Sequence, residues 1–320
     1  MRIVFCGTPQ FAIPTLRHLI AEPDFEIVGV ITQPDRPRGR GRQVSFSPVK
    51  EAAVAAGIRV HQPEKIRTPE AQELLQRIVP DAIVIIAYGQ IIPGRLLPIP
   101  KLGWINLHAS LLPKYRGAAP VNWAIANGET KTGVTSMRID AGMDTGEMLL
   151  QEEMEIGPTE TAPELAARMS ELGAPLMVKT LRGVAAGAIA HRPQDQQRAS
   201  SAPMLKKEDG RIDWSHTAQQ IFNRMRGFTP WPGAYTSFHG QTCHILGEPA
   251  SNDVGQPSPQ PGQSAVPGSL LVERNSALVR CGGATYLRLL SVKVEGRNQV
   301  STAEFINGAH LLSGEHFGET

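Results

Sequence analysis

Residues 82–88 read AIVIIAY and residues 103–109 read GWINLHA, and these two apolar runs decide the fold class. Neither run has a polar face, which is typical of strands that are buried on both sides of a parallel sheet. Two more runs of this kind occur at residues 2–7 (RIVFCG) and 26–32 (EIVGVIT). The first part of the chain therefore holds several buried strands.

Helical segments lie between these strands. Residues 11–22, 47–57 and 68–79 show helical apolar spacing, and the last two open with Ser or Thr before Pro, an N-cap followed by the first helical residue. A longer helical stretch follows at residues 161–187. This alternation predicts a doubly wound α/β domain with a mostly parallel sheet.

The sequence pattern changes near residue 190. Residues 191–208 are polar and aperiodic, which predicts a linker. From residue 209 onward, short alternating segments are separated by turn residues, an all-β pattern compatible with a small OB-like barrel. We therefore expect an α/β domain at residues 1–190, a linker at 191–208 and a smaller all-β domain at 209–320.

Composition excludes some functional classes. Among 320 residues, 41% are hydrophobic and 19% are charged, which fits a globular protein, and the net charge of +2 requires any nucleic-acid contact to rest on local clusters. Cys6, Cys243 and Cys281 lie far apart, so we expect neither a disulfide framework nor a zinc site. The chain opens on a strand-like segment and has no apolar run of membrane-spanning length, so we expect a cytoplasmic protein without signal peptide or membrane contact.

Two polar residues end the predicted strand at residues 103–109. Asn106 and His108 are separated by one residue, so in a strand both side chains project from the same face. Asn can donate to a carbonyl oxygen on which charge develops, and His can hold or move a proton near neutral pH. The alternative is that both are hydrogen-bonded polar residues of the core.

Two acidic residues lie in the loop at residues 139–147. Asp140 or Asp144 could orient a histidine ring and stabilise its charged form. Asp beside Gly also commonly caps its own turn, and we expect one of the two to do so. Spacing alone does not choose between them.

Several stretches resemble the formyltransferase family that uses 10-formyltetrahydrofolate. The resemblance is carried by NLHASLLPKYRGAAPVNWAI at 106–125 and TGVTSMRIDAGMDTGEML at 132–149. It extends over nearly the whole chain, through residues 1–12, 33–50, 87–93 and 223–236. It implies transfer of a formyl group from 10-formyltetrahydrofolate, as co-substrate, to the α-amino group of methionyl initiator tRNA, for translation initiation.

The resemblance also implies the site. The catalytic residues of the family fall on Asn106, His108 and Asp144. The folate would lie beside the turn formed by Ser110, Leu111, Leu112 and Pro113. The pterin ring would be bound by the backbone that begins with Tyr88, Gly89, Gln90 and Ile91. No metal and no obligate protein partner is implied.

An RNA contact is predicted from a cluster of arginines. Arg36, Arg38, Arg40 and Arg42 alternate with Pro and Gly, a pattern suited to phosphates and base edges that orders only on binding. Without the resemblance, a solubilising loop with no partner is the better explanation, and the RNA contact is what the resemblance implies. From Lys206 onward the chain has ten Lys and Arg and ten Asp and Glu, so RNA binding there would require segregation of charge onto one face or basic pieces such as Lys206–Lys207 and Arg224–Arg226.

Two other functions are open from the sequence. A formyltransferase acting on a 4-amino-arabinose nucleotide would share the Asn, His and Asp pattern without needing the arginine cluster. An RNA-binding module on an inactive α/β scaffold would not need the three polar residues.

The arginine cluster yields a prediction. Replacing Arg38, Arg40 and Arg42 by Ala should weaken tRNA binding and flatten its salt dependence, because fewer phosphates are neutralised. The measurement is the slope of log binding constant against log salt concentration. An unchanged slope would exclude phosphate contact by these arginines.

Overall fold

The computed structural model describes residues 1–38, 43–250 and 266–318, and within them the chain divides into two compact units. The first unit comprises Met1–Val121, Lys131–Ile156 and Glu164–Pro203. The second comprises Asn122–Thr130, Gly157–Pro163 and the described part of Met204–Thr320. Residues 191–203, which the sequence analysis assigns to a linker, thus lie within the first unit.

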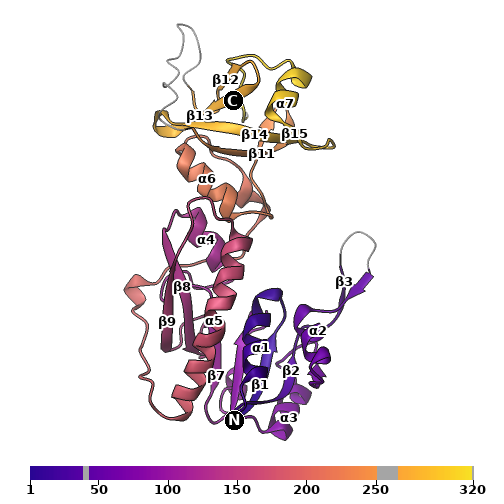
Figure 1. Ribbon diagram of the computed structural model, residues 1–320, viewed down its shortest axis with the longest axis vertical. Coiled ribbons are helices and arrows are strands. Elements are labelled where there is room, and N and C mark those ends of the chain that lie inside the picture. Colours follow the sequence, from indigo (N-terminus) through magenta and orange to yellow (C-terminus); the bar gives the residue numbers. More distant parts are fainter. Residues whose placement is uncertain (39–42, 251–265, 319–320) are drawn as a thin grey trace. The chain divides into compact units, whose positions relative to one another are not determined.

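The first unit is built on a seven-stranded sheet (Figure 1). Its order is β5 (Val60–His61), β2 (Glu26–Ile31), β1 (Arg2–Gly7), β6 (Ala82–Ile86), β7 (Trp104–His108), β8 (Lys131–Arg138) and β9 (Met148–Glu155). The strands from β5 to β7 pair in parallel, whereas β8 pairs antiparallel with both of its neighbours, β7 and β9. The predicted mostly parallel sheet is confirmed. The strand order reverses between β1 and β6, where open α/β sheets bind ligands at the carboxyl ends of their strands.

Helices cover this sheet. The α-helices that belong to it are α1 (Ile13–Ala21), α2 (Pro48–Ala55), α3 (Pro69–Ile78) and α5 (Ala162–Ala185), while α4 (Pro120–Ala126) follows β7. Ser47 and Thr68 cap α2 and α3 by accepting from backbone N–H groups, as their position before Pro predicts. Val4 and Cys6 of β1 pack with Leu75 of α3, so α3 covers one face of the sheet.

Short 3-10 helices complete the secondary structure. They are η1 (Gln10–Ala12), η2 (Gly94–Leu96), η3 (Gln196–Arg198), η4 (Lys207–Gly210) and η5 (Gly282–Ala284). Two of them, η3 and η4, lie in the stretch that the sequence analysis reads as aperiodic. No helix among the described residues is long and apolar enough to cross a membrane.

The arginine cluster lies on a small ribbon. Strands β3 (Arg36–Arg38) and β4 (Gln43–Ser45) pair antiparallel, where the sequence analysis expects a flexible loop. Arg40 and Arg42 lie outside the described residues. At the base of the ribbon, Asp35 accepts from Lys50 Nζ and from Gln62 Nε2 (2.9 Å), and these hydrogen bonds hold the pKa of Asp35 below its usual value.

The second unit is an antiparallel sheet with two helices. Its order is β10 (Tyr235–Phe238), β11 (Gln241–Pro249), β14 (Tyr286–Val294), β13 (Ser276–Arg280) and β12 (Leu270–Glu273), and β15 (Val300–Ser301) pairs with β14. All described pairs in it are antiparallel, which confirms the all-β pattern of the strands. The unit also contains α6 (Ala218–Gly227) and α7 (Thr302–Ala309), and the sequence analysis does not anticipate α6.

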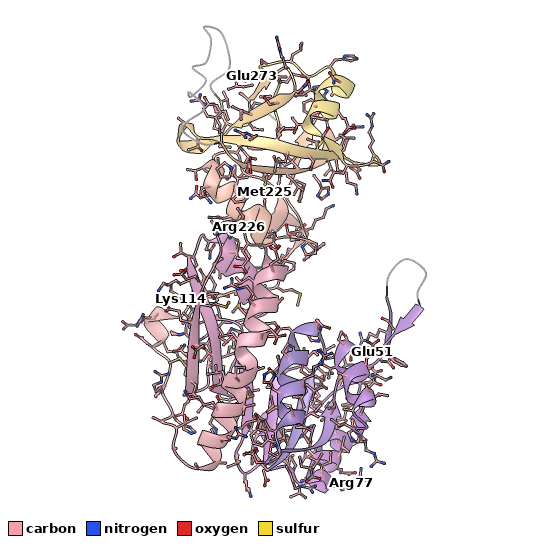
Figure 2. All side chains as sticks on the ribbon, viewed as in Figure 1. Glu51, Arg77, Lys114, Met225, Arg226 and Glu273 are labelled. Atoms are coloured by element: carbon pink, nitrogen blue, oxygen red, sulfur yellow. The ribbon has the colours of Figure 1, made fainter. Side chains whose placement is uncertain are left out.

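A buried arginine holds α6 in place. Arg226 of α6 (Figure 2) is 7% exposed, and its guanidinium donates to the carbonyls of Gly157 and Glu160, both at 3.0 Å. It also donates to Asn223 Oδ1. Burial lowers the pKa of Arg226, but these acceptors compensate for the lost water. Arg226 is therefore committed to the fold and is not free for RNA, although the sequence places it in a basic cluster.

Candidate active site

Strand β7 delivers two polar side chains at its carboxyl end. Asn106 is half-buried and His108 is 6% exposed. No hydrogen bond joins the Asn106 side chain to another described residue, so its amide is available to a ligand. The alternative of two hydrogen-bonded core residues therefore does not apply to Asn106.

The surroundings of His108 fix its tautomer. Its Nε2 lies 2.9 Å from the carbonyl oxygen of Tyr115. A carbonyl only accepts, so this hydrogen bond requires the proton on Nε2. In the neutral ring, Nδ1 then carries the lone pair, and it faces Asp144 Oδ2 at 3.7 Å. A proton arriving at Nδ1 would create an ion pair with Asp144.

The two acids of the 139–147 loop have different tasks. Asp140 caps its own turn, accepting from the Gly142 N–H at 3.0 Å and from Thr145 Oγ1 at 2.7 Å. Asp144 instead faces His108 and has a left-handed backbone, with φ of 53°. The structure thus separates two residues that spacing could not distinguish.

One short backbone segment, Tyr115–Gly117, touches both members of the pair. The Tyr115 carbonyl meets His108, and the Gly117 N–H donates to Asp144 Oδ2 at 2.9 Å. Gly117 has φ of 122°, and a Cβ placed there would lie 2.6 Å from the Ala202 carbonyl oxygen. Only glycine fits this position without strain. The preceding Lys114 is exposed (Figure 2).

A cavity of about 740 Å³ opens beside the sheet's switch point. Its described lining includes Thr8 after β1, Gln33 after β2, and Ala87–Ile91 after β6. Asn106, His108 and Asp144 are not among these lining residues, but Asn106 is the register partner of Ile85 on β6. The cavity and the polar pair thus lie at the carboxyl ends of neighbouring strands.

Residues 88–91 form one wall of the cavity, with their backbone and with the side chains of Gln90 and Ile91. The Tyr88 side chain is 2% exposed, its hydroxyl is buried without a partner, and burial raises its pKa. Its carbonyl accepts from Thr8 Oγ1 at 3.2 Å and from Gln33 Nε2 at 2.9 Å. The Gln90 side chain accepts from the Ile66 N–H, and Ile91 is 78% exposed. Residues 88–91 therefore belong to one hydrogen-bonded wall.

The turn at 110–113 is tightly held. Ser110 is fully buried and donates to the Lys114 carbonyl, while Leu112 is 3% exposed and packs with Met137 and Met148. Leu111 and Pro113 are half-buried. That the four residues border a folate stays a prediction.

Predicted basic residues of the second unit are exposed. Lys206 and Lys207 both reach solvent. Burial first, then the charges of Lys293 and Lys207, lower the pKa of His244, while the charge of Glu295 acts in the opposite direction. Lys293 is also the cross-strand partner of His244. Exposed basic groups therefore occur within residues 206–320, where Lys and Arg equal Asp and Glu in number.

Sequence analysis missed several residues around the pair. Tyr115, Arg116 and Gly117 lie in a motif that was noted but not assigned, and Gln194 lies in the predicted linker. The positive φ of Gly117 could have been suspected from the Arg-Gly turn. Nothing local signals Gln194. Among the described residues no group of three or more His, Cys, Asp or Glu side chains could hold a metal ion.

Comparison with known families identifies the chain. Residues 1–181 match the family described as formyl transferase, and residues 204–310 match its C-terminal domain. The chain belongs to the formyltransferase family. The resemblance found in the sequence is thereby confirmed.

Relatives in this family are similar over their full length. A protein of Solibacter usitatus named methionyl-tRNA formyltransferase is 52% identical over 319 residues, covering 100% of this chain and 99% of the relative. One of the same name from Geobacter sulfurreducens is 48% identical over 320 residues, covering 100% and 97%.

Solved structures share the fold. WlaRD, a sugar 3N-formyl transferase determined with dTDP and 5-N-formyl-THF, matches with a TM-score of 0.65 and 18% identity over 93% of this chain and 99% of that one. HypX from Aquifex aeolicus with tetrahydrofolic acid matches with a TM-score of 0.59 and 15% identity, covering 100% of this chain and 51% of that one. At these identities the likeness concerns the fold alone.

The close approach at Gly117 yields a prediction. Gly117→Ala should destabilise the protein by about 1–3 kcal/mol and lower formyltransferase activity, because the strained backbone must shift and release Asp144. Urea unfolding and an activity assay check both effects. Gly94→Ala is the control, since its added Cβ would meet nothing within 4 Å. Unchanged stability of Gly117→Ala would contradict the described backbone.

Proposed function

We propose that the chain transfers the formyl group of 10-formyltetrahydrofolate to the α-amino group of methionyl initiator tRNA. The observation that carries the chemical part is the set Asn106, His108 and Asp144, with a free amide beside a histidine whose Nδ1 faces a carboxylate at 3.7 Å. The full-length relatives named methionyl-tRNA formyltransferase support the acceptor.

In this proposal the amine nitrogen attacks the formyl carbon and forms a tetrahedral intermediate. The π electrons of the carbon–oxygen double bond move onto the oxygen, which becomes an oxyanion. The Asn106 amide donates to that oxygen, a kind of stabilisation worth about 10²–10³ in rate. His108, whose Nε2–H is bound to the Tyr115 carbonyl, accepts the amine proton on Nδ1, and Asp144 stabilises the charged ring that results. The intermediate then collapses: the carbon–oxygen double bond re-forms, the bond from carbon to the folate nitrogen breaks, and His108 returns the proton to that nitrogen.

We place the folate in the cavity at the carboxyl end of the strand that neighbours Asn106. The cavity at Thr8, Gln33 and Ala87–Ile91 has a volume typical of small-molecule sites. We assign the pterin ring to the backbone at Tyr88, Gly89, Gln90 and Ile91, and the rest of the folate to the Ser110–Pro113 turn. Structural relatives determined with formyl-THF or tetrahydrofolic acid support a folate co-substrate.

The tRNA would be bound by basic groups of both units. In the first unit we assign this role to the arginines at 36, 38, 40 and 42. In the second we assign it to Lys206 and Lys207, and we add Lys293, the cross-strand partner of His244, because its charge and that of Lys207 both lower the pKa of this histidine. Since translation initiation takes place in the cytoplasm, we place the protein there.

The two other functions have less support. A nucleotide-sugar formyltransferase would share the fold, and solved sugar formyltransferases do match, but at 18% identity against 52% for the tRNA-specific relative. An inactive RNA-binding scaffold would leave the His108–Asp144 geometry without a purpose.

A direct assay tests the acceptor. The full chain should formylate methionyl initiator tRNA with 10-formyltetrahydrofolate and leave a charged elongator tRNA unmodified. Product release by mild hydrolysis and chromatography distinguishes formylmethionine from methionine. Equal transfer to both tRNAs, or transfer only to an amino-sugar nucleotide, would refute the proposed substrate.

A substitution tests the catalytic histidine. His108→Ala should lower kcat by about 10²–10⁴, the range for a general acid or base, while tRNA affinity stays close to that of the unmodified protein. The matched control is His18→Ala, since His18 is exposed on α1. A His108→Ala protein with nearly full turnover would remove His108 from the mechanism.

A further inference from the structure

Gln194 makes an unusually complete set of hydrogen bonds. Its Nε2 donates to the carbonyls of Asp144 and Gly146, both at 2.8 Å. Its Oε1 accepts from Arg116 Nε at 2.9 Å and from Arg116 Nη2 at 2.7 Å. The residue is 7% exposed. Because two donors and two acceptor sites are all used, the orientation of this amide is fixed.

The bonds from Gln194 hold a strained residue. Asp144 has φ of 53°, and a non-glycine residue keeps such a backbone only where its surroundings enforce it. Gln194 binds the Asp144 carbonyl and the Gly146 carbonyl two residues further on. Gln194 thus restrains the backbone of the loop, whereas the Asp144 carboxylate is held separately, at Oδ2, by the Gly117 N–H.

The bonds from Arg116 reach the other half of the pair. Arg116 lies between Tyr115, whose carbonyl holds His108, and Gly117, whose N–H holds Asp144. Its own backbone pairs with residues 200–202 through Ser200 O at 2.8 Å and Ala202 N at 2.7 Å. The fork from Arg116 to Gln194 therefore connects the segment that holds His108 to the loop that carries Asp144.

We propose that Gln194, through its fork with Arg116, is a positioning residue that sets the placement of Asp144 against His108. It touches neither side chain of the pair and acts only through the two backbone segments. The assignment rests on the proposed function for its kinetic readout. It also makes residues 191–203 part of the catalytic unit.

The test uses Gln194→Glu in the full chain. The carboxylate has the same shape and keeps the fork to Arg116, but it cannot donate to the carbonyls of Asp144 and Gly146. We expect kcat to fall by about 10- to 100-fold, since small displacements of reacting groups cost up to about 10² in rate, with both KM values unchanged. Gln196→Glu is the matched control, because exposed Gln196 accepts from Arg116 Nη1 at 2.8 Å without touching the Asp144 loop.

A double-mutant cycle separates positioning from simple stabilisation. If Gln194 acts through Asp144, Gln194→Glu should lower kcat no further when Asp144→Ala is already present. An equal loss in both backgrounds, or normal kcat in the single variant, would overturn the proposal. Arg116→Lys, which keeps the charge without the fork, should reproduce the loss of kcat if Gln194→Glu does not fold, and normal turnover would overturn the proposal there too.

An NMR measurement without substrate tests the positioning role of Gln194 separately from the proposed formyl transfer. The ring ¹⁵N and ¹H signals of His108 should move in Gln194→Glu and stay in place in Gln196→Glu. Unmoved signals in Gln194→Glu would overturn the positioning role even if formyl transfer occurs. If the signals move in Gln194→Glu but the unsubstituted chain does not formylate methionyl initiator tRNA, the proposed function is refuted and the positioning role is retained.

Discussion

The backbone between Tyr115 and Gly117 is the constraint on which the site depends. One carbonyl of this segment sets the histidine tautomer, and one N–H two residues later holds the carboxylate opposite it. His108 ends a strand, whereas Asp144 lies in a loop after the next strand, so neither position fixes the other. Main-chain groups supply the connection, and the lack of a side chain at Gly117 permits it.

Much of the fold follows from local chemistry. The apolar runs at β1, β2, β6 and β7 have no solvated face, and parallel strands need none. The Ser-Pro and Thr-Pro pairs mark helix starts because the side-chain oxygen of Ser or Thr accepts from a first-turn backbone N–H that has no partner within the helix. Helix α6 escaped prediction, although its Thr217 and Gln220 form a capping box, because it lies in a part of the chain that the sequence analysis interprets as all-β.

The site was predictable only in part. Period-2 geometry places Asn106 and His108 on one face, which is a property of the strand itself. Choosing Asp144 over Asp140 required the family resemblance, since each stands two residues before a glycine in the same loop. Gln194 could not be found, because its partners are some 50 and 78 residues away along the chain. Long-range contacts of irregular segments leave no pattern in a single sequence.

The cavity and the polar pair occupy adjoining strand ends for a topological reason. The sheet reverses its order at β1 and β6, so the chain after these strands diverges and leaves space, while β7 closes one side of it. A ligand seated against residues 88–91 would then have Asn106 on the neighbouring strand. The placement of Asn106 next to the cavity thus follows from the order of the strands.

The place of Gln194 along the chain also bears on where this domain ends. The match to the N-terminal family domain stops at residue 181, and the match to the C-terminal domain starts at 204. Gln194 and the Ser200–Ala202 ladder fall between them, in residues that such boundaries treat as a connection. A chain cut after α5 would still contain the strands of the sheet, the residues that line the cavity, and Asn106, His108 and Asp144. It would nevertheless lack the segment that braces two of them, so modular swaps in this family should be joined after residue 203.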